Sequence, residues 1–169
     1  MFRAQPSTSR PPLRGRPRPS DVDAVRALTQ ATRMFRPDEV AIAVELVTDG
    51  VEKGDRSEYA FLFADGSHGL DGYICYGRTA CTIGTWDLYW IAVSPATQGT
   101  GVGTKLLQEV ERRLALRDAR LVIIETSSLP HYGATRRFYE RRGYEVVARV
   151  PDFYAPGDDR LIFAKRIHI

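Results

Sequence analysis

The chain has 169 residues, of which 43% are hydrophobic, 27% charged and 10% aromatic, and its formal net charge is +3. This length supports one hydrophobic core, and the composition is that of a folded globular domain, so disordered, fibrous and collagen-like proteins are excluded. Because no apolar stretch is long enough to span a bilayer or to serve as a secretory signal, we predict a cytoplasmic protein with no membrane partner.

The positive charge is concentrated at the start of the chain. Five arginines and five prolines precede the first acidic residue, Asp21, and without those arginines the rest of the chain carries a small negative charge. Prolines lack the backbone N–H donor and favour extended chain. We predict a disordered Pro/Arg-rich tail over residues 1–11 and a single domain over residues 12–169. Since such tails are usually just solvated, nucleic acid is not expected as a partner.

Two helices are predicted at the start of the domain. A short strand near Leu13 is an optional element before them. The first helix covers residues 20–33, where apolar residues recur at helical spacing. The second follows Pro37, because valine and alanine repeat every three or four residues until Gly50 and Gly54 interrupt the pattern.

A sheet comes next. Residues 59–63, 72–76 and 87–93 are rich in aromatic and β-branched side chains and are separated by turns with glycine, which indicates an antiparallel meander. A helix over 104–116 and a continuous apolar strand over 121–124 then predict a β-α-β unit with parallel strands.

The last third of the chain predicts one more helix and two strands. The helix covers residues 134–142, and Gly143 stands where a left-handed residue ends a helix. The strands cover about 144–150 and 160–167. The whole order is ααβββαβαββ. This order predicts a protein of the broad α/β class, and more narrowly an α+β fold.

The most informative stretch is a glycine-rich loop between the strand that ends at Val93 and the helix that follows. It reads Gln98, Gly99, Thr100, Gly101, Val102, Gly103, Thr104. Three alternating glycines leave backbone N–H groups uncovered at a helix start, where a phosphate group can approach them. A dinucleotide-binding fingerprint fails because its third glycine position is Thr104, and a P-loop fails because Lys105 is not flanked by glycine and a hydroxyl residue.

The loop and a later helix together resemble one family. Gln98, Gly101 and Gly103 follow Val93-Ser94-Pro95, and the later helix reproduces a second family pattern, carried by Ala134, Phe138, Tyr139, Gly143 and Tyr144. In loop, helix and element order the chain resembles the GNAT family of N-acetyltransferases over about residues 12–167.

The resemblance implies a fold, a co-substrate and a reaction. The fold would be a mixed, mostly antiparallel sheet flanked by helices, with a splayed parallel strand pair that forms the acetyl-CoA cleft. Backbone at Ala92 and Val93 would bind the pantetheine arm, and residues 98–104 would bind the pyrophosphate. The acetyl group would pass directly to a primary amine of a small molecule, amino acid or peptide, and a homodimer is compatible with the resemblance. A catalytically silent acetyl-CoA-binding regulatory module is the alternative.

Candidate catalytic residues follow from the same resemblance. Tyr139 matches a tyrosine that donates a proton to the departing thiolate in many relatives. Asp87 stands eleven residues before Gln98, at the spacing of a catalytic glutamate in the histone-acetylating branch, but it is shorter by one methylene. Glu125 is the other carboxylate on a strand beside the cleft, and His131 or solvent are further candidates for the base.

Other features of the chain are less specific. Cys75 and Cys81 with the three scattered histidines make no ligand cluster, so no metal is expected. The segment 152–159 offers aromatic and acidic residues that suit a cationic acceptor, but it is equally what a tight turn requires. Four arginines are interpreted as the solvated face of their helix, namely Arg136, Arg137, Arg141 and Arg142.

Overall fold

The computed structural model describes residues 13–167, so the predicted tail over 1–11 lies outside the described residues. The helices are α1 (Pro19–Thr32), α2 (Pro37–Lys53), α3 (Val102–Ala115) and α4 (Gly133–Glu140), with short 3-10 helices over Gly54–Arg56 and Pro130–Tyr132. The strands are β1 (Tyr59–Gly66), β2 (Gly69–Arg78), β3 (Thr85–Val93), β4 (Leu121–Ser127), β5 (Glu145–Ala155) and β6 (Asp158–Arg166). Between residues 13 and 167, no helix is both long and apolar enough to cross a membrane.

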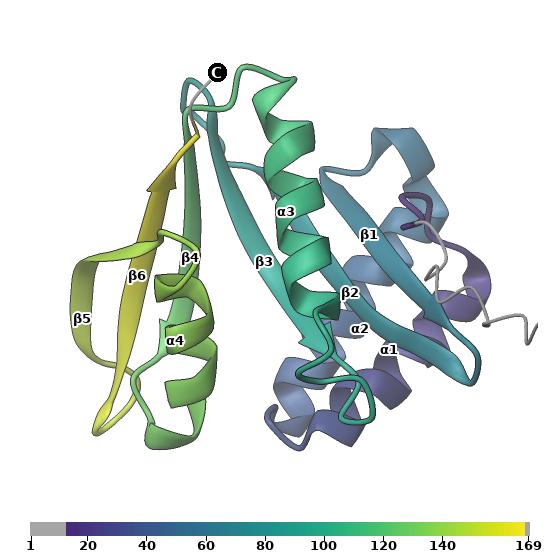
Figure 1. Ribbon diagram of the computed structural model, residues 1–169, viewed down its shortest axis with the longest axis horizontal. Coiled ribbons are helices and arrows are strands. Elements are labelled where there is room, and N and C mark those ends of the chain that lie inside the picture. Colours follow the sequence, from purple (N-terminus) through teal and green to yellow (C-terminus); the bar gives the residue numbers. More distant parts are fainter. Residues whose placement is uncertain (1–12, 168–169) are drawn as a thin grey trace, which may run out of the picture.

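The strands form one mixed sheet in the order β1-β2-β3-β4-β6-β5. Only β3 and β4 pair in parallel, and the other neighbours pair antiparallel. Figure 1 shows α3 on one face of β1–β3, α1 and α2 on the opposite face, and α4 against β4 and β6. The predicted fold class is confirmed, including the order ααβββαβαββ and the parallel pair.

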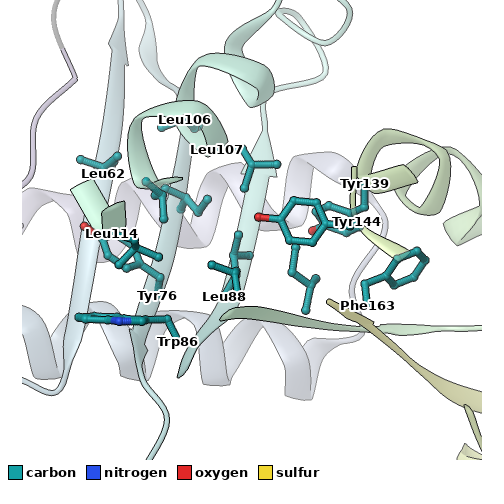
Figure 2. Close-up of a cluster of buried hydrophobic side chains, with 14 of the residues drawn as sticks. Leu62, Tyr76, Trp86, Leu88, Leu106, Leu107, Leu114, Tyr139, Tyr144 and Phe163 are labelled. Carbon is teal, nitrogen blue, oxygen red and sulfur yellow. The ribbon is translucent and has the colours of Figure 1, made fainter. Parts of the chain in front are cut away.

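Two apolar clusters hold the helices on the sheet. The cluster under α3 and α4 is shown in Figure 2, where Leu106, Leu107 and Leu114 of α3 contribute at one end and Tyr139, Tyr144 and Phe163 group at the other. The second cluster joins α1 and α2 to the opposite face of β1–β3, with Phe61, Phe63 and Tyr73 among its buried members. Each large apolar side chain that is buried contributes about 1.5–3 kcal/mol, so the two clusters fix both faces of the sheet.

Two details of the N-terminal region differ from the prediction. Gly50 does not interrupt the second helix but lies buried inside it. Glycine is needed at this position because a Cβ would stand 2.5 Å from the Phe61 ring. Near Leu13 the chain makes an isolated bridge, from Arg14 to Phe63, rather than a strand. The Arg14 guanidinium, which bonds to Asp21 and Asp65 carboxylates, fixes this segment to the sheet edge.

The feature that positions the site is a divergence of β3 from β4. Their pairing runs from Thr85 to Leu88 and stops there, opposite Ile124. The register of β2 with β3 shifts at the same place, because Tyr76 pairs with Leu88 and Cys75 with Trp90, which leaves Tyr89 as the extra residue of a bulge. A bulge bends and twists its strand. Figure 1 shows the two strands separating toward their C-terminal ends.

Candidate active site

The space between the diverging strands is a cleft of about 810 Å³. Its walls come from the second halves of β3 and β4, the loop before α3, one face of α4, the connection between α1 and α2, and the hairpin of β5 and β6. A cleft of this size suits a ligand larger than a single metabolite ring. The cleft brings together segments that lie far apart in the sequence, between residues 32 and 158, whereas β1 and β2 contribute no lining residue.

The glycine-rich loop forms one end of the cleft. Gly99 has φ +75° and Gly101 has φ +90°, and a Cβ built on either glycine would meet no atom within 4 Å. Gly103 differs, because a Cβ there would stand 3.3 Å from the Phe138 ring. Only glycine adopts these positive φ values without strain, so the loop leaves an open surface of backbone.

The start of α3 adds donors to that surface. Gly101 is the N-cap of α3, and no side chain caps the helix. The first N–H groups of a helix have no partner inside it, and the helix dipole favours an anion there. Of the predicted loop residues, all but Thr100 line the cleft. The loop can therefore hold a phosphate group in the manner predicted from the sequence.

The edge of β3 forms one side wall. Ala92 and Val93 line the cleft, and this part of β3 has no strand partner on the side of β4. The side-chain amide of Gln98 donates to the carbonyl of Val93 over 3.2 Å. An unpaired strand edge can pair with an extended ligand as an added strand, while Gln98 fixes the loop to the end of the strand.

Tyr139 lies in the opposite wall, on α4. Its side chain is 3% exposed and packs against Tyr144 and Phe163 with ring centroids 5.9 Å away in both cases. Burial raises the pKa of Tyr139 well above the ordinary value of a phenol. The hydroxyl therefore stays protonated and can act only as a proton donor at neutral pH.

The candidate bases are placed differently. Glu125 lines the cleft on β4, where Arg160 pairs with its carboxylate at 2.6 Å, and His131 also lines the cleft. Asp87 is not among the residues that line the cleft, and its carboxylate accepts a hydrogen bond of 2.7 Å from the Thr79 hydroxyl. The structure thus brings Tyr139 and Glu125 to one cleft and does not bring Asp87 to it.

Two arginines interpreted as solvated have structural partners. Arg136 donates to the carbonyls of Ser127 and Leu129 at 2.8 and 2.9 Å, which ties α4 to the end of β4. Arg142 lines the cleft, stacks over the Phe138 ring at 3.7 Å from its centroid, and donates to the Thr104 hydroxyl at the start of α3. Burial lowers the pKa of Arg142, but a guanidinium remains charged at neutral pH. Arg142 therefore places a positive charge beside the loop.

The other end of the cleft is aromatic and acidic. The turn of the hairpin at Gly157 has φ +79°, so the tight-turn interpretation of 152–159 holds, and yet the hairpin also sends Tyr154 and Asp158 into the cleft. Side chains that face them come from distant segments, namely Phe35, Glu39, Trp90, Glu125 and Tyr132. No sequence motif marks most of these residues. The sequence signal that could have indicated this end of the cleft was the Pro156-Gly157 turn, which is preceded by Tyr154 and followed directly by Asp158.

Metal binding has no visible basis in the part of the chain that the structure describes. Within residues 13–167 no group of three or more histidine, cysteine or acidic side chains is arranged to hold a metal ion. Cys75 is buried and Cys81 exposed, and both are free thiols.

Comparisons with known proteins agree with this geometry. Residues 57–146 match the family model described as an acetyltransferase (GNAT) domain. A crystal structure of a protein assigned to the GNAT acetyltransferase family, from Desulfovibrio desulfuricans, is 41% identical to this chain, with a TM-score of 0.89 over 93% of this chain and 99% of that one.

More distant solved structures share the fold. The aminoglycoside 6'-N-acetyltransferase from Enterococcus faecium is 22% identical, with a TM-score of 0.73 over 94% of this chain and 98% of that one. The ribosomal-protein-S18-alanine N-acetyltransferase from Escherichia coli is 19% identical, with a TM-score of 0.73 over 94% of each chain. A search of curated protein sequences finds no match.

Proposed function

Since the chain belongs to the GNAT acetyltransferase family and is an acyltransferase, we propose that it transfers the acetyl group of acetyl-CoA directly to a primary amine. The acceptor is a small molecule, an amino acid or a peptide. The observation that carries this proposal is the divergence of β3 from β4 at the Tyr89 bulge, since it opens a cleft with a phosphate-binding loop at one end and a buried proton donor in its wall.

Acetyl-CoA fits the residues of the loop end. The positive-φ glycines Gly99 and Gly101 face open space, the start of α3 supplies unpaired N–H groups, and Arg142 adds a positive charge. These are the groups that bind a pyrophosphate. When bound, acetyl-CoA supplies the acetyl group as a reactive thioester. The chain supplies the remaining functions, which are orientation, charge stabilisation and proton transfer.

Backbone at Ala92 and Val93 provides orientation and charge stabilisation. The free edge of β3 pairs with the pantetheine arm, as an extra strand would. An N–H group of this edge, directed at the carbonyl oxygen, stabilises the negative charge that develops there during attack. Gln98 holds the carbonyl of Val93 and so keeps this edge in place.

Tyr139 is the proton donor in the proposal. Its buried hydroxyl keeps its proton because burial raises its pKa. The phenol can pass this proton to the departing thiolate as the carbon–sulfur bond breaks, although burial makes it a weaker acid than a thiol. Tyr144 and Phe163 hold the ring in one orientation by packing against it.

Glu125 is the proposed base for the incoming ammonium. Its carboxylate lines the cleft at the point where β4 leaves β3. Asp87, proposed from the sequence for the same role, has less support because it lies outside the cleft lining and accepts a bond from Thr79. His131 and solvent remain the other routes for this proton. The cytosolic location and the choice between monomer and homodimer also stay predictions.

The proposal is tested by measuring release of the CoA thiol over a panel of primary amines, amino acids and short peptides. Each amine is paired with its dimethylated form, which lacks an N–H bond and so cannot form a stable amide. We expect thiol release with at least one primary amine and none with its dimethylated partner. Binding of acetyl-CoA with no thiol release for any amine would contradict the proposal and favour a silent binding module.

A further inference from the structure

Two neighbouring aspartates at the start of β6 are both buried but have different partners. Asp158 is 4% exposed and Asp159 is 7% exposed. Asp159 accepts from the backbone N–H of Asp152 at 2.8 Å and forms an ion pair with Arg149. Asp158 accepts a hydrogen bond of 2.5 Å from the Ser127 hydroxyl, and within residues 13–167 it has no ion pair. Successive strand residues face opposite sides, so Asp158 faces the cleft.

A buried carboxylate with no cation is an unfavourable arrangement. Charges removed from water need a partner of opposite charge or a full set of hydrogen bonds. The Ser127 hydroxyl has a single proton to donate and leaves most of the acceptor capacity of Asp158 unused. Asp159, the next residue, has an ion pair with Arg149 and a hydrogen bond from the Asp152 N–H. The lack of a cationic partner is therefore specific to Asp158, which faces the cleft.

The surroundings of Asp158 favour a cation over a neutral group. Two more carboxylates line the same end of the cleft, Glu39 and Glu125, and the rings of Tyr132 and Tyr154 lie among them. Burial and then the negative charge of Glu39, with a smaller contribution from Asp158, raise the pKa of Tyr132 to about 12. Glu125 has its cation in Arg160 and Glu39 lies 4.0 Å from Arg36, so Asp158 is the carboxylate of this group that lacks one.

The cleft wall next to Asp158 carries further polar atoms that have no partner. Thr126 precedes Ser127 on β4 and is 6% exposed. Among residues 13–167, neither its hydroxyl nor the buried indole N–H of Trp90 has a hydrogen-bond partner. Both residues line the cleft. Buried polar groups are nearly always hydrogen-bonded in folded proteins. Because both atoms are themselves buried, they are not counted among the groups that contact the acceptor, and the proposal rests on Asp158.

We propose that the acceptor carries a second cationic group besides the amine that is acetylated, and that Asp158 binds this group. The carbon chain between the two nitrogens lies against the Tyr132 and Tyr154 rings, which also attract a cation through their faces. The inference rests on the proposed amine acetylation and names its substrate class, which is diamines, or peptides and amino-acid derivatives with a basic side chain.

The test compares acceptors of equal size that differ in the second charge. Diaminobutane is paired with pentylamine, diaminohexane with heptylamine, and lysinamide with 2-aminoheptanamide, and kcat/KM for thiol release is measured for each. We expect the acceptor with two amino groups to be preferred over its partner with one, by about 30-fold or more in kcat/KM, in at least one pair. This is the size of effect expected when one partner of a buried charge pair is removed. The free-diamine and lysinamide arms distinguish a polyamine-like acceptor from a peptide-like one.

Two matched variants locate the preference. Asp158→Asn keeps the shape and removes the charge, so the 30-fold preference should fall to nearly one, whereas Asp159→Asn should keep it. The preferred acceptor with two amino groups should also raise the melting temperature of the wild-type protein, and this shift should disappear in Asp158→Asn. Melting of Asp158→Asn at or above the wild-type temperature shows that the variant is folded, as expected when an unpaired buried charge is removed.

The possible failures are distinguishable. If amines are acetylated but the paired acceptors react equally, or if Asp158→Asn retains the preference, the inference about Asp158 is overturned and the acetylation stands. If no amine of either kind releases thiol from acetyl-CoA, the proposed acetylation itself is wrong, and the inference falls with it.

Discussion

The two ends of the cleft are built in different ways. The loop end is one continuous segment, residues 98–104, and it offers mainly backbone, through glycines with positive φ and the start of α3. The other end, where the acceptor is proposed to bind and which we call the acceptor end, is assembled from side chains of the α1–α2 connection, β3, β4 and the β5–β6 hairpin. The first presents backbone groups that every residue has, and the second presents side-chain groups that only particular residues have.

This difference matters for specificity. A backbone site recognises the same phosphates whatever side chains surround it, so it suits the co-substrate that a whole family shares. A side-chain site changes with each substitution, so it suits the acceptor. We therefore expect the loop end to respond to the presence of a Cβ and the acceptor end to respond to the removal of single polar atoms.

The largest effect is expected for Tyr139→Phe, which removes one oxygen from the cleft wall. The ring and its packing on Tyr144 and Phe163 remain, so folding and acetyl-CoA affinity should be preserved. Without the proton donor, kcat should fall by about 100- to 10,000-fold. Because the missing group is a donor, raising the pH should not restore the rate. Wild-type kcat in this variant would remove Tyr139 from the mechanism.

A smaller effect, about 100-fold at neutral pH, is expected for Glu125→Gln. The acceptor amine must lose a proton before attack, and the neutral fraction of an alkyl amine with a pKa near 10.4 rises about tenfold for each pH unit up to that pH. The rate should therefore recover toward wild type as the pH rises. Asp87→Asn is the matched control, since Asp87 lies outside the cleft lining, and it should stay close to wild type throughout. A large loss in Asp87→Asn with little loss in Glu125→Gln would reverse this assignment.

The smallest effect is expected at the loop end. Gly101→Val introduces a branched side chain at φ +90°, directed into open space where the phosphates are proposed to bind. Backbone strain of about 1–3 kcal/mol must be relieved by moving the loop, so the Kd for acetyl-CoA measured by calorimetry should rise about 10-fold or more. Gly54→Val, with φ +55° and no atom within 4 Å, controls for strain alone. Equal affinity in both variants would contradict a backbone site.

Much of the fold followed from the sequence, as did the position of the glycine-rich loop before α3. Helical and strand periodicity is a local property, so the order of the elements and the left-handed Gly143 were predicted correctly. The open backbone of the glycine-rich loop was also predictable, because it depends on the absence of side chains in a short continuous segment. Element ends were less accurate, as for β2, which extends from 69 to 78 rather than from 72 to 76.

The acceptor end was decided by tertiary structure alone. The Tyr89 bulge, which ends the pairing of β3 with β4, depends on β2 and has no mark in the sequence. Nor does the sequence indicate that Arg142 reaches Thr104, or that of two adjacent aspartates Asp159 finds Arg149 while Asp158 finds only a hydroxyl. Local pattern determines which way a side chain leaves its own strand, but its partners come from segments that are brought near only when the whole sheet and its helices pack together.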